Sequence, residues 1–288
     1  MEKLVYLNGS LVPESEAKVS IFDRGFLYGD GLFETMRVYS GKVFRLERHL
    51  QRLFHAAGII ALPISRDEKE LREAIYQTLQ ANHLQEAYLR LTISRGEGGT
   101  GPDIPEKVGV NMVIVAKPLP LYPRSWYEEG VKAAIVDVRR DEASSLSRIK
   151  SLNYLPNILA RLEARDKGAE EGIMLNSQGC LAEGTVSNLF IISQGKVVTP
   201  SVESGILPGI TREAILELVP RQGWEISERR VNLSELREAE EAFLTNSLRE
   251  VVPLTRVDGR PVGEGKPGKI TGTIAVAYTE LVKKETQP

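Results

Sequence analysis

Lys150 is the residue in this sequence whose type and position most clearly allow chemistry. It follows a polar segment, 140–148, and directly precedes an apolar-faced helix expected over 152–167. A lysine at such a boundary is usually a solvated surface residue. A desolvated lysine, however, loses its proton readily and becomes a nucleophile toward carbonyl groups. The position of Lys150 alone does not decide between these interpretations, so a catalytic role depends on which other residues could act with it.

Glu183 is the first candidate partner. It lies in the stretch Leu-Ala-Glu-Gly-Thr-Val-Ser-Asn-Leu-Phe, 181–190, just before an apolar strand. A turn rich in polar residues is the simple interpretation. The functional one is a carboxylate that pairs with a protonated ring nitrogen of a cofactor and so keeps the ring electron-withdrawing.

Two further segments could hold a phosphate group. The stretch Leu-Pro-Gly-Ile-Thr-Arg, 207–212, leads from a Pro-Gly turn into a helix expected over 211–221. The first backbone N–H groups of a helix bind anions, and the Thr211 hydroxyl could add a contact. Arg52, on a helix expected over 47–57, could make a charge-assisted contact. A plain capped helix and a surface arginine are the alternatives.

Two expected strands, 32–39 and 87–94, mix aromatic and cationic side chains on one face. Side chains alternate between the two faces of a strand. A face of this composition is a poor core and a plausible carboxylate site, although a partly exposed amphipathic face would look similar. Its expected members are Phe33, Thr35, Arg37, Tyr88, Arg90 and Thr92.

The elements that must position these residues are mixed helices and strands. A proline-rich segment, 117–123, cannot be a helix interior or a central strand. We therefore predict an α/β (α+β mixed) chain with a small N-terminal α/β domain over 1–117, an interdomain linker over 118–130, and a larger C-terminal domain over 131–288. The expected strands are 4–7, 42–46, 110–116, 131–138, 172–175, 187–192 and 242–245, and further helices are expected over 67–82 and 268–284.

Composition excludes several classes of protein. The chain has 288 residues, a net charge of −2 and dispersed basic residues, so neither nucleic-acid nor membrane partners are expected. It has one cysteine, Cys180, and its start lacks a signal peptide's apolar core, which favours the cytoplasm. The three histidines do not cluster with acids, so no metal site is expected.

One segment imitates a nucleotide-binding motif. The stretch Gly-Glu-Gly-Lys-Pro-Gly-Lys, 263–269, resembles a P-loop, but Ile270 stands where a serine or threonine must bind magnesium. No buried strand is expected before it. We therefore do not expect a nucleotide-hydrolysing enzyme.

The motifs together resemble the signature of class IV (fold type IV) pyridoxal-phosphate-dependent aminotransferases. The resemblance rests on Glu183-x-Thr-x-x-Asn188-Leu-Phe190, on Val197-x-Thr199 and on Leu207-x-Gly209-Ile-x-Arg212. The segments 23–34 and 88–96 are also similar to this family, so the resemblance covers nearly the whole chain. It implies a two-domain fold with a barrel-like sheet in the larger, cofactor-binding domain, a homodimer, and a role in amino-acid biosynthesis.

The resemblance also implies roles for individual residues. Lys150 would form the Schiff base with pyridoxal 5'-phosphate (PLP) and shuttle a proton between Cα and C4′. Glu183 would hold the ring nitrogen and Tyr154 the O3′ atom, although Tyr154 follows Lys150 by four residues where branched-chain members have five. The phosphate would be bound by Arg52, Ile210, Thr211, Asn246 and Ser247, and the substrate by Tyr28, Phe33, Arg37, Tyr88 and Arg90.

Three kinds of enzyme share this signature, and the sequence favours one of them. The loop 95–102 lacks the arginine and histidine with which D-amino acid aminotransferases bind the carboxylate, which argues against the common D-specific pattern. Thr35 departs from the glycine usual in branched-chain enzymes. A transaminase for branched-chain or other aliphatic L-amino acids, with a 2-keto acid such as 2-oxoglutarate as acceptor, is the leading hypothesis. An aminodeoxychorismate lyase, which forms 4-aminobenzoate, and a D-amino acid or broad-specificity transaminase remain open. A non-catalytic binding protein is least favoured, because Lys150 is present.

Overall fold

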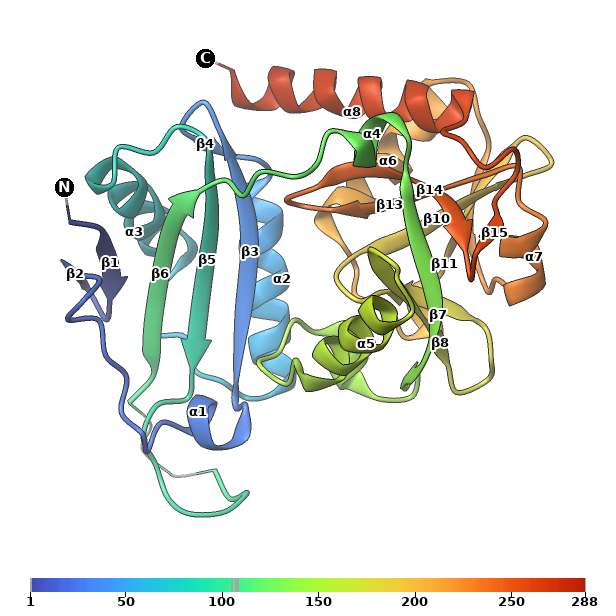
Figure 1. Ribbon diagram of the computed structural model, residues 1–288. Helices are drawn as coiled ribbons and strands as arrows, with labels where there is room; N and C mark the ends of the chain where they lie inside the picture. Colours follow the sequence, from blue (N-terminus) through green and yellow to red (C-terminus); the bar gives the residue numbers. More distant parts are fainter. Residues whose placement is uncertain (1, 105, 107–108, 288) are drawn as a thin grey trace. The chain divides into compact units, whose positions relative to one another are not determined.

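The computed structural model describes residues 2–104, 106 and 109–287, which form two compact units (Figure 1). Unit 1 comprises the described residues of Met1–Pro120, Ile149–Asn153 and Lys284–Pro288. Unit 2 comprises Leu121–Arg148 and Tyr154–Lys283. The short segment that carries Lys150 therefore belongs to unit 1, whereas the residues before and after it belong to unit 2.

Unit 1 is built on an antiparallel six-stranded sheet in the order β2-β1-β6-β5-β3-β4. Alternating burial is clearest in β5 and β6, where every second residue faces the core. The strands are β1 (Leu4–Leu7), β2 (Ser10–Pro13), β3 (Gly31–Tyr39), β4 (Lys42–Val43), β5 (Ala87–Ser94) and β6 (Asn111–Pro118), and the helices are α1 (Arg24–Tyr28), α2 (Leu46–Ile59) and α3 (Glu68–Ala81).

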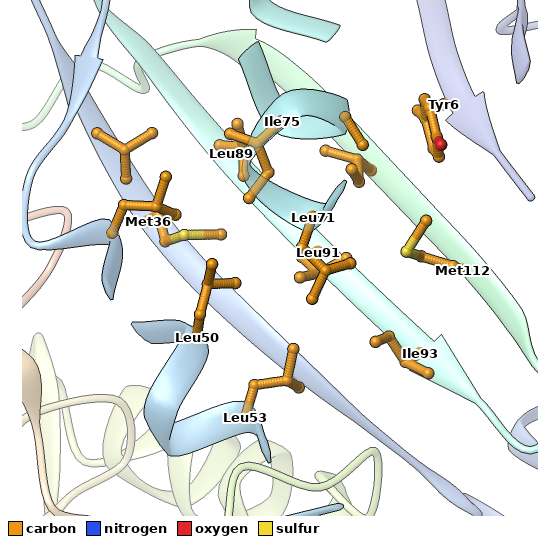
Figure 2. Packing of buried hydrophobic residues seen from close by; sticks show 14 of the residues in the cluster. Tyr6, Met36, Leu50, Leu53, Leu71, Ile75, Leu89, Leu91, Ile93 and Met112 are labelled. Carbon is orange, nitrogen blue, oxygen red and sulfur yellow. The ribbon is translucent and has the colours of Figure 1, made fainter. Parts of the chain in front are cut away.

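The core of unit 1 lies between the sheet and helices α2 and α3 (Figures 1 and 2). Strand residues such as Met36 and Leu89 point toward Leu50 of α2 and Leu71 of α3, and all four are fully buried. Helix α3 begins where the sequence dictates, because Asp67 and Glu70 form a reciprocal capping box. Strand residues on the opposite face of the sheet, such as Phe33, do not pack against α2 and α3.

Unit 2 is built on a nine-stranded mixed sheet in the order β12-β11-β10-β13-β14-β7-β8-β9, with β15 paired to β14. Its apolar core includes the stacked rings of Phe190 and Phe243, 4.8 Å apart. The strands are β7 (Val131–Arg140), β8 (Glu171–Asn176), β9 (Leu181–Gly184), β10 (Asn188–Ser193), β11 (Lys196–Pro200), β12 (Ile226–Arg229), β13 (Glu241–Asn246), β14 (Glu250–Val257) and β15 (Arg260–Pro261). The helices are α4 (Ser125–Glu128), α5 (Leu155–Asp166), α6 (Ile210–Arg221), α7 (Leu233–Arg237) and α8 (Lys269–Thr286), with 3-10 turns at Ser145–Arg148 and Val202–Ser204. Helix α8 belongs to unit 2 up to Lys283, and its remaining residues belong to unit 1.

Two expected helix boundaries were wrong. Helix α2 does not stop before Gly58 but continues to Ile59. The helix expected from residue 152 begins only at Leu155, with a proline in its first turn. The reason is tertiary: the residues before it pair with β3, where the Phe33 N–H donates to the Lys150 carbonyl and the Leu152 N–H donates to the Gly31 carbonyl, each at 2.9 Å.

Among the described residues, no helix combines the length and the apolar character needed to cross a membrane.

Candidate active site

The predicted site residues divide between the two units, and each set is described by itself. Unit 1 carries Tyr28, Phe33, Arg37, Arg52, Tyr88, Arg90 and Lys150. Unit 2 carries Tyr154, Glu183, Ile210, Thr211, Asn246 and Ser247.

Lys150 is held against strand β3 and beside an aromatic ring. The backbone hydrogen bond to Phe33 fixes the start of its side chain, and Nζ lies 4.6 Å from the centroid of the Phe33 ring. The residue is half-buried. A lysine whose amine lies against an aromatic face, rather than extending into water, fits the nucleophile interpretation better than the surface one.

A buried ion-pair network surrounds Arg52. Its Nε and Nη2 atoms donate to the two carboxylate oxygens of Glu34 at 2.8 and 2.6 Å, and Nδ1 of His49 lies 2.7 Å from the same carboxylate. Glu34 and His49 are each about 1% exposed. Sequence reasoning missed both residues. The helical spacing of His49 and Arg52, one turn apart on α2, could have paired these two residues from the sequence. Only the fold brings Glu34 of β3 to them.

The surroundings of Glu34 and His49 shift the pKa values of both side chains. Burial by itself would raise the pKa of Glu34, but the charge of Arg52 and the hydrogen bond with His49 outweigh it and hold the pKa at about 2. Burial lowers the pKa of His49, and the cations Arg52 and Lys150 also favour its neutral form, against the opposing effect of Glu34. At neutral pH the network is thus an arginine–glutamate ion pair with a neutral imidazole donating to the carboxylate.

Strands β3 and β5 present the expected mixed face. Their register pairs Phe33 with Thr92, Thr35 with Arg90, and Arg37 with Tyr88. The guanidinium carbon of Arg90 lies 3.8 Å from the Phe33 ring centroid, and its Nε donates to the Thr92 hydroxyl at 3.1 Å. We refer to this surface as the β3–β5 face. Cationic and aromatic groups are therefore adjacent here, and Lys150 contacts the same ring.

Tyr28 is tied to the loop that follows β5. Its hydroxyl accepts a hydrogen bond from the Gly101 N–H at 2.9 Å, and Arg24 lies over its ring at 5.0 Å. Arg24 also donates to the carbonyls of Gly98 and Gly101 at 3.3 and 3.0 Å. The loop 96–101 is thus held by α1, so Tyr28 shapes this loop.

Glu183 lies on the short strand β9 with its carboxylate held from three sides. It is 6% exposed. One oxygen is 3.2 Å from Nη2 of Arg140, and the other accepts from the Leu207 N–H at 3.0 Å and from Nδ2 of Asn188 at 3.3 Å. Arg140 was not singled out from the sequence. A cation and donors directed at a buried carboxylate favour its ionised form, which is the form that binds a protonated ring nitrogen.

The segment before α6 keeps helix N–H groups available for an anion. Helix α6 begins at Ile210 with Gly209 as the N-cap, and no side chain of the cap residue can occupy its first N–H groups. A β-carbon at Gly209 would collide with Oδ1 of Asn188, so glycine lets these two residues approach closely here. Thr211 follows in the first turn, buried. The amides and hydroxyl form an anion site of the expected kind.

Asn246 and Ser247 occupy the turn after β13. The Asn246 side chain accepts from the N–H groups of Leu248 and Arg249 at 3.0 and 2.8 Å and so shapes this turn itself. Tyr154 is the residue preceding α5, where it is the N-cap.

The P-loop-like segment, 263–269, is followed by backbone N–H groups that bind a carboxylate of the same unit. The N–H groups of Ile270 and Thr271 at the start of α8 donate to the two oxygens of Glu241 at 3.0 and 2.8 Å. The position in which a P-loop would hold phosphate is thus occupied by a side chain of the same unit.

Comparison with known proteins shows the family of the chain. The family model for amino-transferase class IV matches residues 31–257, so the chain belongs to that family, whose cofactor is PLP. Over 97% of this chain and 96% of the other, it is 38% identical to a putative branched-chain-amino-acid aminotransferase of Methanocaldococcus jannaschii. It is 33% identical to a D-alanine aminotransferase of Bacillus licheniformis, over 98% of each chain.

Solved structures show the same fold. A crystal structure of the Escherichia coli branched-chain amino acid aminotransferase superposes with a TM-score of 0.95 at 34% identity, covering 100% of this chain and 97% of that one. The expected family, the fold type and the transaminase class are therefore confirmed. Each unit by itself carries groups of the kind that PLP needs. Unit 2 has the buried Glu183 carboxylate beside Arg140 and the start of α6, whose N-cap Gly209 has no side chain, and unit 1 has Lys150 against the Phe33 ring.

Proposed function

We propose that this enzyme transfers the amino group of branched-chain or other aliphatic L-amino acids to a 2-keto acid such as 2-oxoglutarate, with Lys150 as its catalytic residue. The observation that carries the proposal is the common position of Lys150 and Arg90 at the Phe33 ring, 4.6 and 3.8 Å from its centroid. A transaminase needs an amine that can move the Cα proton of the substrate, a cation for the substrate carboxylate and an apolar surface for its side chain. These three groups meet at this ring.

Each predicted residue then has a physical task. PLP, when bound, supplies an aldehyde that condenses with amines and a ring that withdraws electrons from the substrate Cα. The Lys150 amine removes the Cα proton and returns it at C4′, and Tyr154 donates to O3′ of the cofactor. Glu183, with its carboxylate beside Arg140, holds the proton on the ring nitrogen.

The phosphate and carboxylate have separate binding groups in this proposal. Arg52, oriented by Glu34, and the start of α6 with Ile210 and Thr211 bind the phosphate, together with Asn246 and Ser247. The substrate contacts the β3–β5 face, where Arg37 and Arg90 bind its carboxylate. Tyr28, Phe33 and Tyr88 supply the apolar and aromatic surface.

A D-amino acid transaminase is the second candidate. A specific observation favours it, namely the 33% identity to a D-alanine aminotransferase over 98% of both chains. The stereochemistry is decided by which side of the substrate Cα faces Lys150, so the β3–β5 face alone allows both.

We also propose that the protein is a cytoplasmic homodimer. Residues around α1 expose large apolar side chains, including Phe22 at 64% and Phe26 at 73%. In unit 2, the solvent face of α5 exposes Leu155, Ile158 and Leu159. Exposed apolar side chains of this kind, taken in each unit by itself, mark protein contacts, and a second copy of the chain is the partner that the family implies.

The test combines labelling with a substrate panel. Borohydride should fix PLP to the purified protein, and peptide mapping should place it on Lys150. Lys150→Ala should take up no label, whereas Lys167→Ala, at the exposed C-cap residue of α5, should be labelled like wild type. Turnover with L-leucine and 2-oxoglutarate supports the proposal. Turnover confined to D-alanine, or to 4-amino-4-deoxychorismate with release of pyruvate, would replace it with the corresponding alternative.

A further inference from the structure

Unit 2 contains a second buried carboxylate, Glu171, that the proposed function does not use. It is the first residue of β8 and is 1% exposed. Arg161 of α5 lies 3.5 Å from one of its oxygens, and Arg249 lies 3.4 Å from the other. A buried carboxylate is stable only where cations and hydrogen-bond donors satisfy it. The partners of Glu171 therefore show which segments it connects.

The first group of partners is the turn that follows Glu183. One oxygen of Glu171 accepts from the Thr185 N–H at 3.1 Å and from the Thr185 hydroxyl, and the other accepts from the Ser187 hydroxyl at 3.0 Å. Gly184 lies directly against this carboxylate. A β-carbon there would collide with the Ser187 hydroxyl and come within 3.3 Å of the Glu171 carboxyl carbon. Glu171 therefore determines the course of the chain immediately after Glu183.

The second partner is the turn between β13 and β14. Arg249 closes the turn that begins at Asn246, where the Asn246 side chain accepts from its N–H. Its guanidinium is 3.4 Å from Glu171 and lies over the rings of Trp126 and Tyr122 at 5.0 and 5.5 Å. The ion pair thus attaches the turn of Asn246 and Ser247 to the same carboxylate that holds the turn after Glu183.

We propose that Glu171 is a positioning residue of the active site, which fixes the ring-nitrogen carboxylate Glu183 and the phosphate turn at Asn246 and Ser247 relative to each other. The proposal rests on the proposed function, because those two segments matter only if they hold PLP. The pyridine ring of PLP is rigid and its phosphate is attached through a short CH2–O linker, so groups that contact both ends must keep a separation within a narrow range. One carboxylate bonded to both turns provides that constraint within unit 2.

Glu171→Gln tests this inference with little change in volume. Glutamine keeps one accepting oxygen, loses the charge that pairs with Arg249, and cannot accept from both turns as the carboxylate does. We expect about tenfold weaker PLP binding, measured by titration of the apoenzyme, and a similar loss in kcat at saturating PLP. The pH at which the visible band of the bound cofactor titrates should also shift, because Glu183 is then less well aligned.

Glu170→Gln is the matched control. Glu170 is adjacent in sequence and its carboxylate accepts from the Lys132 N–H at 2.8 Å near the surface, so the same substitution there should change none of these quantities. If Glu171→Gln does not fold, Arg249→Met and Thr185→Val each remove one arm of the network, and both should weaken PLP binding in the same direction.

Three outcomes decide the matter. Weaker PLP binding with a shifted titration in the Glu171 or paired variants supports the inference. Variants that lose only thermal stability, while PLP affinity, kcat and the titration match wild type, would show that Glu171 is merely structural and overturn it. A wild-type protein that binds no PLP would overturn the proposed function, and this inference with it.

Discussion

Replacing Glu34 with glutamine tests how much the buried network around Arg52 stabilises the fold. Glu34 is fully buried and accepts two hydrogen bonds from Arg52 and one from His49. The difference between its ordinary pKa of 4.5 and the pKa of about 2 in the folded protein corresponds to roughly 3 kcal/mol. Removal of one partner of a buried ion pair costs a comparable amount, about 3–5 kcal/mol. We therefore expect Glu34→Gln to lower the free energy of unfolding by about 3 kcal/mol at pH 7.

The pH dependence gives this prediction a second signature. Because folding lowers the pKa of Glu34, its stabilisation is complete above pH 4.5 and is lost as the pH falls toward about 2. About 2 kcal/mol of it should be gone at pH 3. The deficit of Glu34→Gln relative to wild type should therefore shrink by about that amount between pH 7 and pH 3.

The assay is urea unfolding at both pH values, followed by circular dichroism at one protein concentration. Tryptophan fluorescence is unsuitable, because Trp126 and Trp224 both belong to unit 2 and Glu34 to unit 1. Glu47→Gln on α2 is the control, since its ion pair with Arg72 is about half exposed and such pairs contribute about 0–1 kcal/mol. A deficit below about 0.5 kcal/mol at pH 7, or one that is equal at both pH values, would refute the reasoning.

Three further changes have defined outcomes. Arg140→Met removes the cation 3.2 Å from Glu183 and should weaken PLP binding about tenfold in a titration of the apoenzyme; unchanged affinity would contradict the role given to Arg140. Gly209→Ala should displace Asn188 and lower the free energy of unfolding by about 1–3 kcal/mol, measured by urea titration. Phe26→Ser should shift the protein toward monomers in light scattering, whereas Leu121→Ser, at a 99% exposed position, should not; an unchanged mass for Phe26→Ser would argue against a contact at α1.

Local sequence patterns were reliable where the physics is local. Helix α3 could be predicted closely because its apolar spacing and its capping residues lie within one continuous segment. The same holds for β5, whose expected bounds of 87–94 match the structure. The β3–β5 face also followed from alternation, and the register confirms that Thr35 and Arg90 are paired across it.

Elements that depend on distant partners were missed or misplaced. The short strands β9, β11 and β12 carry too few residues for a periodic signal and exist because neighbouring strands supply their hydrogen bonds. The start of α5 was misplaced because residues 150–152 pair with β3, more than 110 positions earlier in the chain. The domain boundaries at 117 and 131 and the roles of the site residues stay predictions.

The sequence by itself determined the family and the cofactor, and it predicted Lys150 and Glu183 as groups that could do chemistry, because these conclusions depend on residue types at fixed spacing. Only the tertiary structure decided their environments. The fold pairs Arg52 with Glu34, Glu183 with Arg140, and Glu171 with Arg249. The spacing of these residues along the chain does not predict the pairs. A buried charge must be satisfied by whatever group the fold brings within about 3 Å of it, and only the packing of strands and turns from distant parts of the chain determines which group that is.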